Sequence, residues 1–119
     1  MNNMEWNALK SPDQLEMIRE ESKSLPVLIF KHSYRCSISR MALDRLERKW
    51  QGETAGIKPY FLDLISYREV SNRVADQFKV DHESPQVLLI RNGEAVYDSS
   101  HYDIELSKII AAAGKQEAQ

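Results

Sequence analysis

The only cysteine of this chain, Cys36, is its strongest candidate for chemistry. It lies in a polar loop that follows the apolar run 27–30 and precedes a segment, 37–50, whose pattern predicts a helix. At the start of a helix the backbone N–H groups lack partners and the dipole is positive, so the position favours a thiolate over a thiol. Because the thiolate is the form of cysteine that attacks, this placement indicates thiol chemistry.

The competing interpretation is a buried and inert cysteine, because free cysteine is among the most buried residue types. Composition alone favours that interpretation. Position reverses the preference, because a core cysteine belongs inside an apolar run, whereas Cys36 stands between Arg35 and Ser37 in a polar loop.

Basic residues are concentrated around Cys36, although the chain as a whole has a formal charge of -2. Between positions 31 and 49 only Asp44 and Glu47 are acidic, against the basic residues Lys31, Arg35, Arg40, Arg45, Arg48 and Lys49. In the far part of the helix these charges are expected to form solvated pairs, such as Asp44 with Arg48 or Arg40. Near Cys36 they would favour the thiolate and attract an anionic partner.

The composition is that of an ordinary globular chain, with 42% apolar and 29% charged residues among 119. We expect one domain over residues 1–119, with about five residues frayed at each end. The sequence contains no apolar run near the ~20 residues of a membrane span, and its first residues do not resemble a signal peptide. The small net charge does not favour nucleic acid or membrane, and a single cysteine suits the reducing cytoplasm.

Apolar periodicity predicts the elements that position the Cys36 loop. Trp6 and Leu9 are expected to anchor an edge segment. A first helix is predicted from Ser11, with Pro12 at its first position and Gln14 completing a capping box. It ends before Pro26, and its core face consists of Leu15, Ile18, Ser22 and Leu25. The run 27–30 then indicates a buried strand, and the helix over 37–50 carries a core stripe of Ile38, Ala42, Leu46 and Trp50, with Met41 beside it.

The second half of the chain continues this alternation after a helix-breaking segment, 51–56. A strand over 58–63 precedes a capping box at Ser66–Glu69 and a helix whose core face consists of Val70, Val74 and Phe78. Pro85 opens a strand over 86–90, an Asn-Gly turn at 92–93 leads to a strand over 95–97, and a last helix runs from about 103 until Gly114 stops it. This order predicts an α/β fold, a small mixed sheet of about four strands with helices on both faces.

This arrangement, with its cysteine after the central strand and its proline before the hairpin, resembles the thioredoxin fold. The segments 29–33, Cys36, 38–39 and 84–87 resemble more narrowly the monothiol bacilliredoxins, a thioredoxin-like family associated with the bacillithiol redox system. The resemblance covers about 6–110. It implies that Cys36 is the attacking cysteine, that Ser39 stands where dithiol relatives keep a resolving cysteine, and that Pro85 is a cis-proline preceded by Ser84, whose backbone pairs with substrate. Sequence alone favours an ordinary trans proline at this position.

Two positions depart from the family pattern. Ser37 stands where many relatives have proline, which leaves the start of the helix less rigid and adds a hydroxyl near the sulfur. Tyr34 replaces a residue that is often small and polar, and it is expected to stack on the thiol site or narrow it.

The expected activity is removal of a low-molecular-weight thiol, bacillithiol or an analogue, from mixed disulfides on client proteins. With one cysteine the chain cannot resolve its own mixed disulfide, so a second thiol must do so. Ser39 either donates a hydrogen bond to the Cys36 thiolate or is a plain surface serine. The remaining candidates, for stabilising the thiolate or binding carboxylates of the small thiol, are Lys31, His32 and Arg35. A metal site at His32 is not expected, because His82 and His101 belong to other loops.

Two other functions remain open. A monothiol protein of this fold can hold an iron–sulfur cluster with an external thiol, although the Cys-Gly-Phe-Ser signature of monothiol glutaredoxins is absent and residues 36–39 are Cys-Ser-Ile-Ser. A non-catalytic adaptor would instead bind a partner strand at Ser84–Pro85. No tightly bound cofactor, metal, nucleic acid or membrane is expected, and the oligomeric state is left open.

Overall fold

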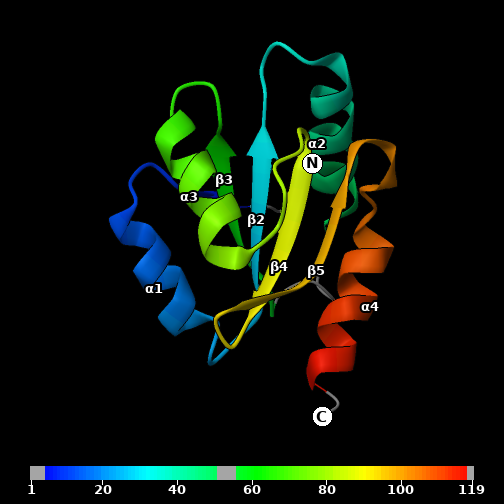
Figure 1. Ribbon diagram of the computed structural model, residues 1–119. Coiled ribbons are helices and arrows are strands. Elements are labelled where there is room, and N and C mark those ends of the chain that lie inside the picture. Colours follow the sequence, from blue (N-terminus) through cyan, green and yellow to red (C-terminus); the bar gives the residue numbers. More distant parts are fainter. Residues whose placement is uncertain (1–4, 51–55, 118–119) are drawn as a thin grey trace.

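A five-stranded mixed sheet forms the centre of the protein in a computed structural model, which describes residues 5–50 and 56–117, with side chains through 114. The strands are β1 (Asn7–Ala8), β2 (Val27–His32), β3 (Lys58–Asp63), β4 (Gln86–Arg91) and β5 (Glu94–Ser100). Their spatial order is β1-β3-β2-β4-β5 (Figure 1). Strands β1, β3 and β2 are mutually parallel, whereas β4 runs antiparallel to both β2 and β5.

Two pairs of helices cover the two faces of the sheet (Figure 1). Helices α1 (Asp13–Glu21) and α3 (Arg68–Phe78) pack on one face, and α2 (Ser37–Lys49) and α4 (Leu106–Glu117) on the other. A short 3-10 helix, η2 (His101–Asp103), follows β5. The predicted fold class is therefore confirmed. The fifth strand, β1, is the edge segment expected beside Trp6 and Leu9.

Strand β2 contains a continuous apolar run because both of its faces are buried. Val27 and Ile29 belong to the core beneath α1 and α3, whereas Leu28 and Phe30 belong to the core beneath α2 and α4. The same alternation continues beyond the predicted end of the strand at 30. It carries two polar residues, Lys31 and His32, into the interior on opposite faces of the sheet, and both are fully buried.

Two predicted capping boxes differ from the structure. Helix α1 starts at Asp13 with Pro12 at its N-cap, so the Ser11 hydroxyl does not cap it, although the Gln14 side chain accepts the Ser11 N–H at 3.1 Å. Helix α3 starts at Arg68 rather than after Ser66. The carboxylate of Asp63 accepts the Ser66 N–H at 3.2 Å instead. The Asp63 carboxylate, at the end of β3, takes the place of the predicted Glu69 carboxylate and closes the loop before the helix begins.

The last two helices also differ in detail from their sequence patterns. The stripe of α2 faces the core through Ser39, Ala42 and Leu46, whereas Met41 is 57% exposed. Helix α4 begins at Leu106, because η2 occupies the preceding turn, and it continues through Gly114 to Glu117. Gly114 does not stop the helix, since it lacks the positive φ that a glycine C-cap adopts. Most of the predicted breaker segment, 51–55, and the outermost termini lie outside the described residues.

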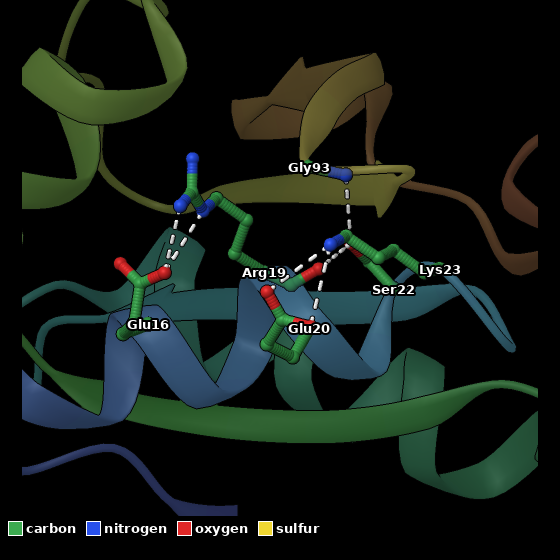
Figure 2. A network of polar contacts seen from close by, with 6 residues as sticks. All are labelled: Glu16, Arg19, Glu20, Ser22, Lys23 and Gly93. Atoms are coloured by element: carbon green, nitrogen blue, oxygen red, sulfur yellow. Dashed lines mark hydrogen bonds and ion pairs between the residues drawn. The ribbon is translucent and has the colours of Figure 1, made fainter.

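The hairpin between β4 and β5 has the predicted Asn-Gly turn, with φ of 55° at Asn92 and 79° at Gly93. Positive φ at both central residues is the geometry that matches the twist of the flanking strands. The turn is attached to the end of α1, because Ser22 O accepts the Asn92 N–H and Ser22 Oγ accepts the Gly93 N–H, both at 2.8 Å. Figure 2 shows the contact between Ser22 and Gly93 beside two exposed ion pairs, Glu16 with Arg19 and Glu20 with Lys23. The contact fixes the hairpin that carries β4.

Gly93→Ala is expected to lower the free energy of unfolding by about 1–2 kcal/mol, because alanine disfavours positive φ. Its Cβ would also approach Arg19 Cγ to 3.1 Å. The matched control is Gly114→Ala, where a Cβ meets nothing within 4 Å inside α4. That change is expected to raise stability by up to about 1 kcal/mol. Urea unfolding measures the free energy of unfolding of the two variants. A loss of stability in Gly114→Ala, or unchanged stability in Gly93→Ala, would contradict the prediction.

Candidate active site

Cys36 lies at the N-cap of α2, with an extended backbone at φ -113° and ψ 120°. Its N–H donates to Ser33 O at 3.1 Å and its carbonyl accepts the Arg40 N–H at 3.2 Å, so the loop is closed before the helix starts. The thiol is partly exposed, and the first turn of α2 contains no acidic residue. The predicted placement of the cysteine at the start of a helix is therefore found.

The Ser84–Pro85 peptide bond is cis and lies at the same end of the sheet as the Cys36 loop. The strand register establishes this position, because Gln86 pairs with Lys31 near the end of β2. The carbonyl of Pro85 accepts the His101 N–H at 3.0 Å, and the Ser84 hydroxyl is buried with no partner in the described part of the chain. The cis geometry agrees with what the family resemblance implied.

Ser39 lies one helical turn after Cys36 and is fully buried, so the prediction of a plain surface serine is wrong. Its Oγ lies 2.7 Å from His32 Nδ1 and accepts the Ser33 N–H at 3.1 Å. These two contacts link the start of α2 to the end of β2. The expected hydrogen bond from Ser39 to the Cys36 sulfur stays a prediction.

His32 is enclosed by aromatic rings. Its centroid lies 4.5 Å from that of Tyr34, with the rings perpendicular, and 5.3 and 5.8 Å from those of Phe61 and Phe30. Burial lowers the pKa of His32 from 6.5; nearby Asp63 opposes the shift and Arg40 adds to it. The imidazole is therefore neutral at pH 7. Its Nε2 atom is buried without a partner among the described residues. His32 is thus an internal support of Ser39, not a solvent-facing cation.

Lys31 does not face Cys36, contrary to the expectation that it stabilises a thiolate or binds carboxylates. Successive side chains of a strand point to opposite faces, so Lys31 lies on the α3 side of the sheet. Its Nζ is 3.3 Å from His82 Nδ1, and burial lowers the pKa of Lys31 from 10.5 to about 8. His82 is therefore the partner of Lys31 on this face of the sheet, a contact that the sequence did not indicate.

Three exposed side chains are near neighbours of Cys36 in the sequence. Tyr34 is 59% exposed and meets the buried His32 ring edge-on. Arg35 and Ser37 flank Cys36 in the sequence, and both are exposed. The aromatic support from Phe61 was missed, because it comes from β3 and no local pattern distinguishes it from other core residues.

Within residues 5–50 and 56–117, no group of three or more His, Cys, Asp or Glu side chains is placed to hold a metal ion. None of the helices described is long and apolar enough to cross a bilayer.

Solved structures match this chain over most of its length. One, described as having a thioredoxin fold and proposed there to be an oxidoreductase, is 34% identical to this chain, with a TM-score of 0.75 over 88% of this chain and 90% of that one. The thioredoxin of Malassezia sympodialis is 16% identical, with a TM-score of 0.73 over 97% of this chain and 93% of that one. That of Fasciola hepatica is 17% identical, with a TM-score of 0.69 over 92% and 97%. The fold is that of thioredoxin.

The thioredoxin fold, with one cysteine at the N-cap of α2, places the chain among the thioredoxin-like oxidoreductases. Residues 7–109 match the family described as monothiol bacilliredoxin BrxC. The chain belongs to that family, as its sequence resemblance implied.

Proposed function

We propose that the Cys36 thiolate removes a low-molecular-weight thiol from mixed disulfides on client proteins. The sulfur of Cys36 attacks the sulfur of the small thiol, a new disulfide forms, and the client leaves as a reduced thiolate. A second small thiol then attacks the adduct, which regenerates Cys36 and releases a symmetric small-thiol disulfide. The observation that carries this proposal is a partly exposed cysteine at a helix N-cap, at the end of the sheet where β4 begins, in a chain without a second cysteine.

Ser39 connects the buried interior to the reacting sulfur in this scheme. Its oxygen already accepts the Ser33 N–H and lies 2.7 Å from His32 Nδ1. When the neutral imidazole carries its proton on Nδ1, it donates to the Ser39 oxygen, and the Ser39 hydroxyl is free to donate to the Cys36 thiolate one turn earlier. A hydrogen bond to a charged sulfur is stronger than one to a neutral thiol, so the arrangement supports the thiolate.

The exposed residues would bind the two substrates. The exposed Arg35 would bind carboxylates of the small thiol, Tyr34 would narrow the approach to the sulfur, and the Ser37 hydroxyl would act near the thiol. The backbone of Ser84, before Pro85, would pair with an extended client segment. Bacillithiol is the small thiol that the family description favours. We place the reaction in the cytoplasm, where a reduced thiol pool resolves the adduct, and no resident cofactor takes part.

Intact-mass spectrometry tests this function directly. The reduced protein is mixed with the symmetric disulfides of bacillithiol, glutathione, coenzyme A and cysteine, and then with a client protein carrying each thiol. We expect one small-thiol adduct on Cys36, reduced client in equal amount, and loss of the adduct when free small thiol is added. The fraction of Cys36 that carries an adduct with each candidate ranks the thiols.

Two outcomes would contradict the proposal. An unmodified mass with every disulfide, together with slow alkylation of Cys36, would favour the adaptor that binds a partner strand. Visible absorbance of the purified protein that disappears when Cys36 is alkylated would favour an iron–sulfur carrier.

A further inference from the structure

A group of polar side chains lies on the face of the sheet away from Cys36, beneath the loop 79–84 that joins α3 to β4. Its members are Lys31 of β2, Ser71 of α3, His82 of the loop and Gln86 of β4, and we call them the back-face cluster. Lys31, Ser71 and Gln86 are no more than 1% exposed, whereas His82 is exposed. Fully buried polar residues at the end of a sheet require partners, and these residues find them in the loop.

Within the described residues, the side-chain hydrogen bonds of the back-face cluster all involve loop 79–84. Lys31 Nζ lies 3.3 Å from His82 Nδ1, and Ser71 Oγ lies 3.5 Å from the same atom. Gln86 donates through Nε2 to Asp81 O at 3.0 Å and accepts the Glu83 N–H through Oε1 at 3.4 Å. The loop is therefore held at three successive residues, immediately before Ser84.

The contact between Lys31 and His82 depends on the charge of the imidazole. Lys31 is a buried ammonium, and the acceptor that the structure gives it is His82 Nδ1, which can accept only while the ring is neutral. Burial, Lys31 and Arg68 lower the pKa of His82 from 6.5, while Glu83 opposes them. The ring is neutral at pH 7. Protonation at lower pH would place two cations 3.3 Å apart and break the contact.

We infer that Lys31 and His82 are positioning residues that hold loop 79–84 so that Ser84 presents its backbone to the client. The inference rests on the proposed function, because it assigns the loop to client binding. It predicts that the two faces of the sheet have different roles. Residues on the α2 side support the sulfur, and residues on the α3 side support recognition of the client segment.

Kinetics with two substrates separate these roles. For a peptide mixed disulfide, His82→Ala and Lys31→Met are each expected to raise KM about tenfold at pH 7.5, the effect of losing one charged hydrogen bond, with kcat nearly unchanged. Exchange with a small-thiol disulfide, which makes no strand contact, is expected to stay within about twofold. Gln77→Ala changes an exposed residue of α3 and is the matched control. It should leave KM and kcat unchanged for both substrates.

The pH profile and a conservative variant distinguish positioning from a general loss of structure. Lowering the pH from 7.5 to 5 is expected to raise the peptide KM of the wild-type protein about tenfold, as His82 becomes charged. His82→Gln keeps an acceptor for Lys31 and does not titrate, so its KM should stay near the wild-type value at both pH values. Lys31→Met lacks the second cation, so its peptide KM should be the same at pH 5 as at pH 7.5.

Three results would overturn the inference: equal peptide KM in all variants, an equal loss in His82→Gln and His82→Ala, or an equal loss with the small disulfide. If the wild-type protein does not exchange thiols at all, the proposed function fails, and amide hydrogen exchange then decides the role of the contact. Lys31→Met should speed exchange of the Glu83 amide at least about tenfold if the contact holds the loop, and unchanged protection would refute it.

Discussion

Cys36→Ser is expected to abolish small-thiol transfer, with a fall in rate of at least about a thousandfold, the scale on which loss of an attacking group is felt. The serine hydroxyl is not ionised at neutral pH and does not form a disulfide. The chain holds no other cysteine to take over the reaction. Release of the small thiol from a labelled client protein measures the transfer rate, and intact-mass spectrometry should show no adduct.

The effect must come from the lost sulfur and not from a changed fold. Cys36 is partly exposed at an N-cap, where serine is a favourable residue, so the variant should unfold at the same urea concentration as the wild-type protein. Met17→Ser is the matched control, because it removes an exposed sulfur from α1, on the other face of the sheet. Residual transfer in Cys36→Ser, or an equal loss in Met17→Ser, would contradict the assignment of Cys36 as the attacking residue.

Lys31→Met is expected to stabilise the protein by about 2 kcal/mol at pH 7, because the wild-type structure buries an ammonium group. The pKa of Lys31 is lowered from 10.5 to about 8 on folding. Between these values the unfolded chain binds more protons than the folded one, so wild-type stability should rise as the pH increases from 8 toward 10.5. The variant lacks this group and should lack the rise. Urea unfolding at pH 7 and 9.5 measures both effects.

The upper pH is kept below 10 because the pKa of Tyr60 is raised by burial and by its hydrogen bond to Glu21, so its ionisation would destabilise the folded state at higher pH. Lys23→Met is the matched control, since this side chain is 59% exposed and changes its surroundings little on folding. A wild-type stability that does not change between pH 7 and 9.5, or a similar change in Lys31→Met, would show that Lys31 keeps its ordinary hydration.

The amino-acid sequence by itself determined the order of the elements and the place of the attacking group. Apolar runs, the Asn-Gly turn and the proline before β4 are local signals, and each reports on a few neighbouring residues. The single cysteine, between an apolar run and a helical pattern, was enough to indicate an N-cap thiol. The family resemblance supplied the cis-proline, which no local pattern distinguishes from a trans one.

Only the tertiary structure decided which polar residues serve the sulfur. Lys31 and His32 are adjacent in a basic loop, and the sequence suggested the same role for both. Strand β2 extends through them, so they point to opposite faces, His32 to Ser39 and Lys31 to His82, 51 residues away in sequence. Local pattern cannot show this, because burial and hydrogen-bond partners of a polar side chain depend on packing between distant segments. The back-face cluster therefore exists only in the folded protein.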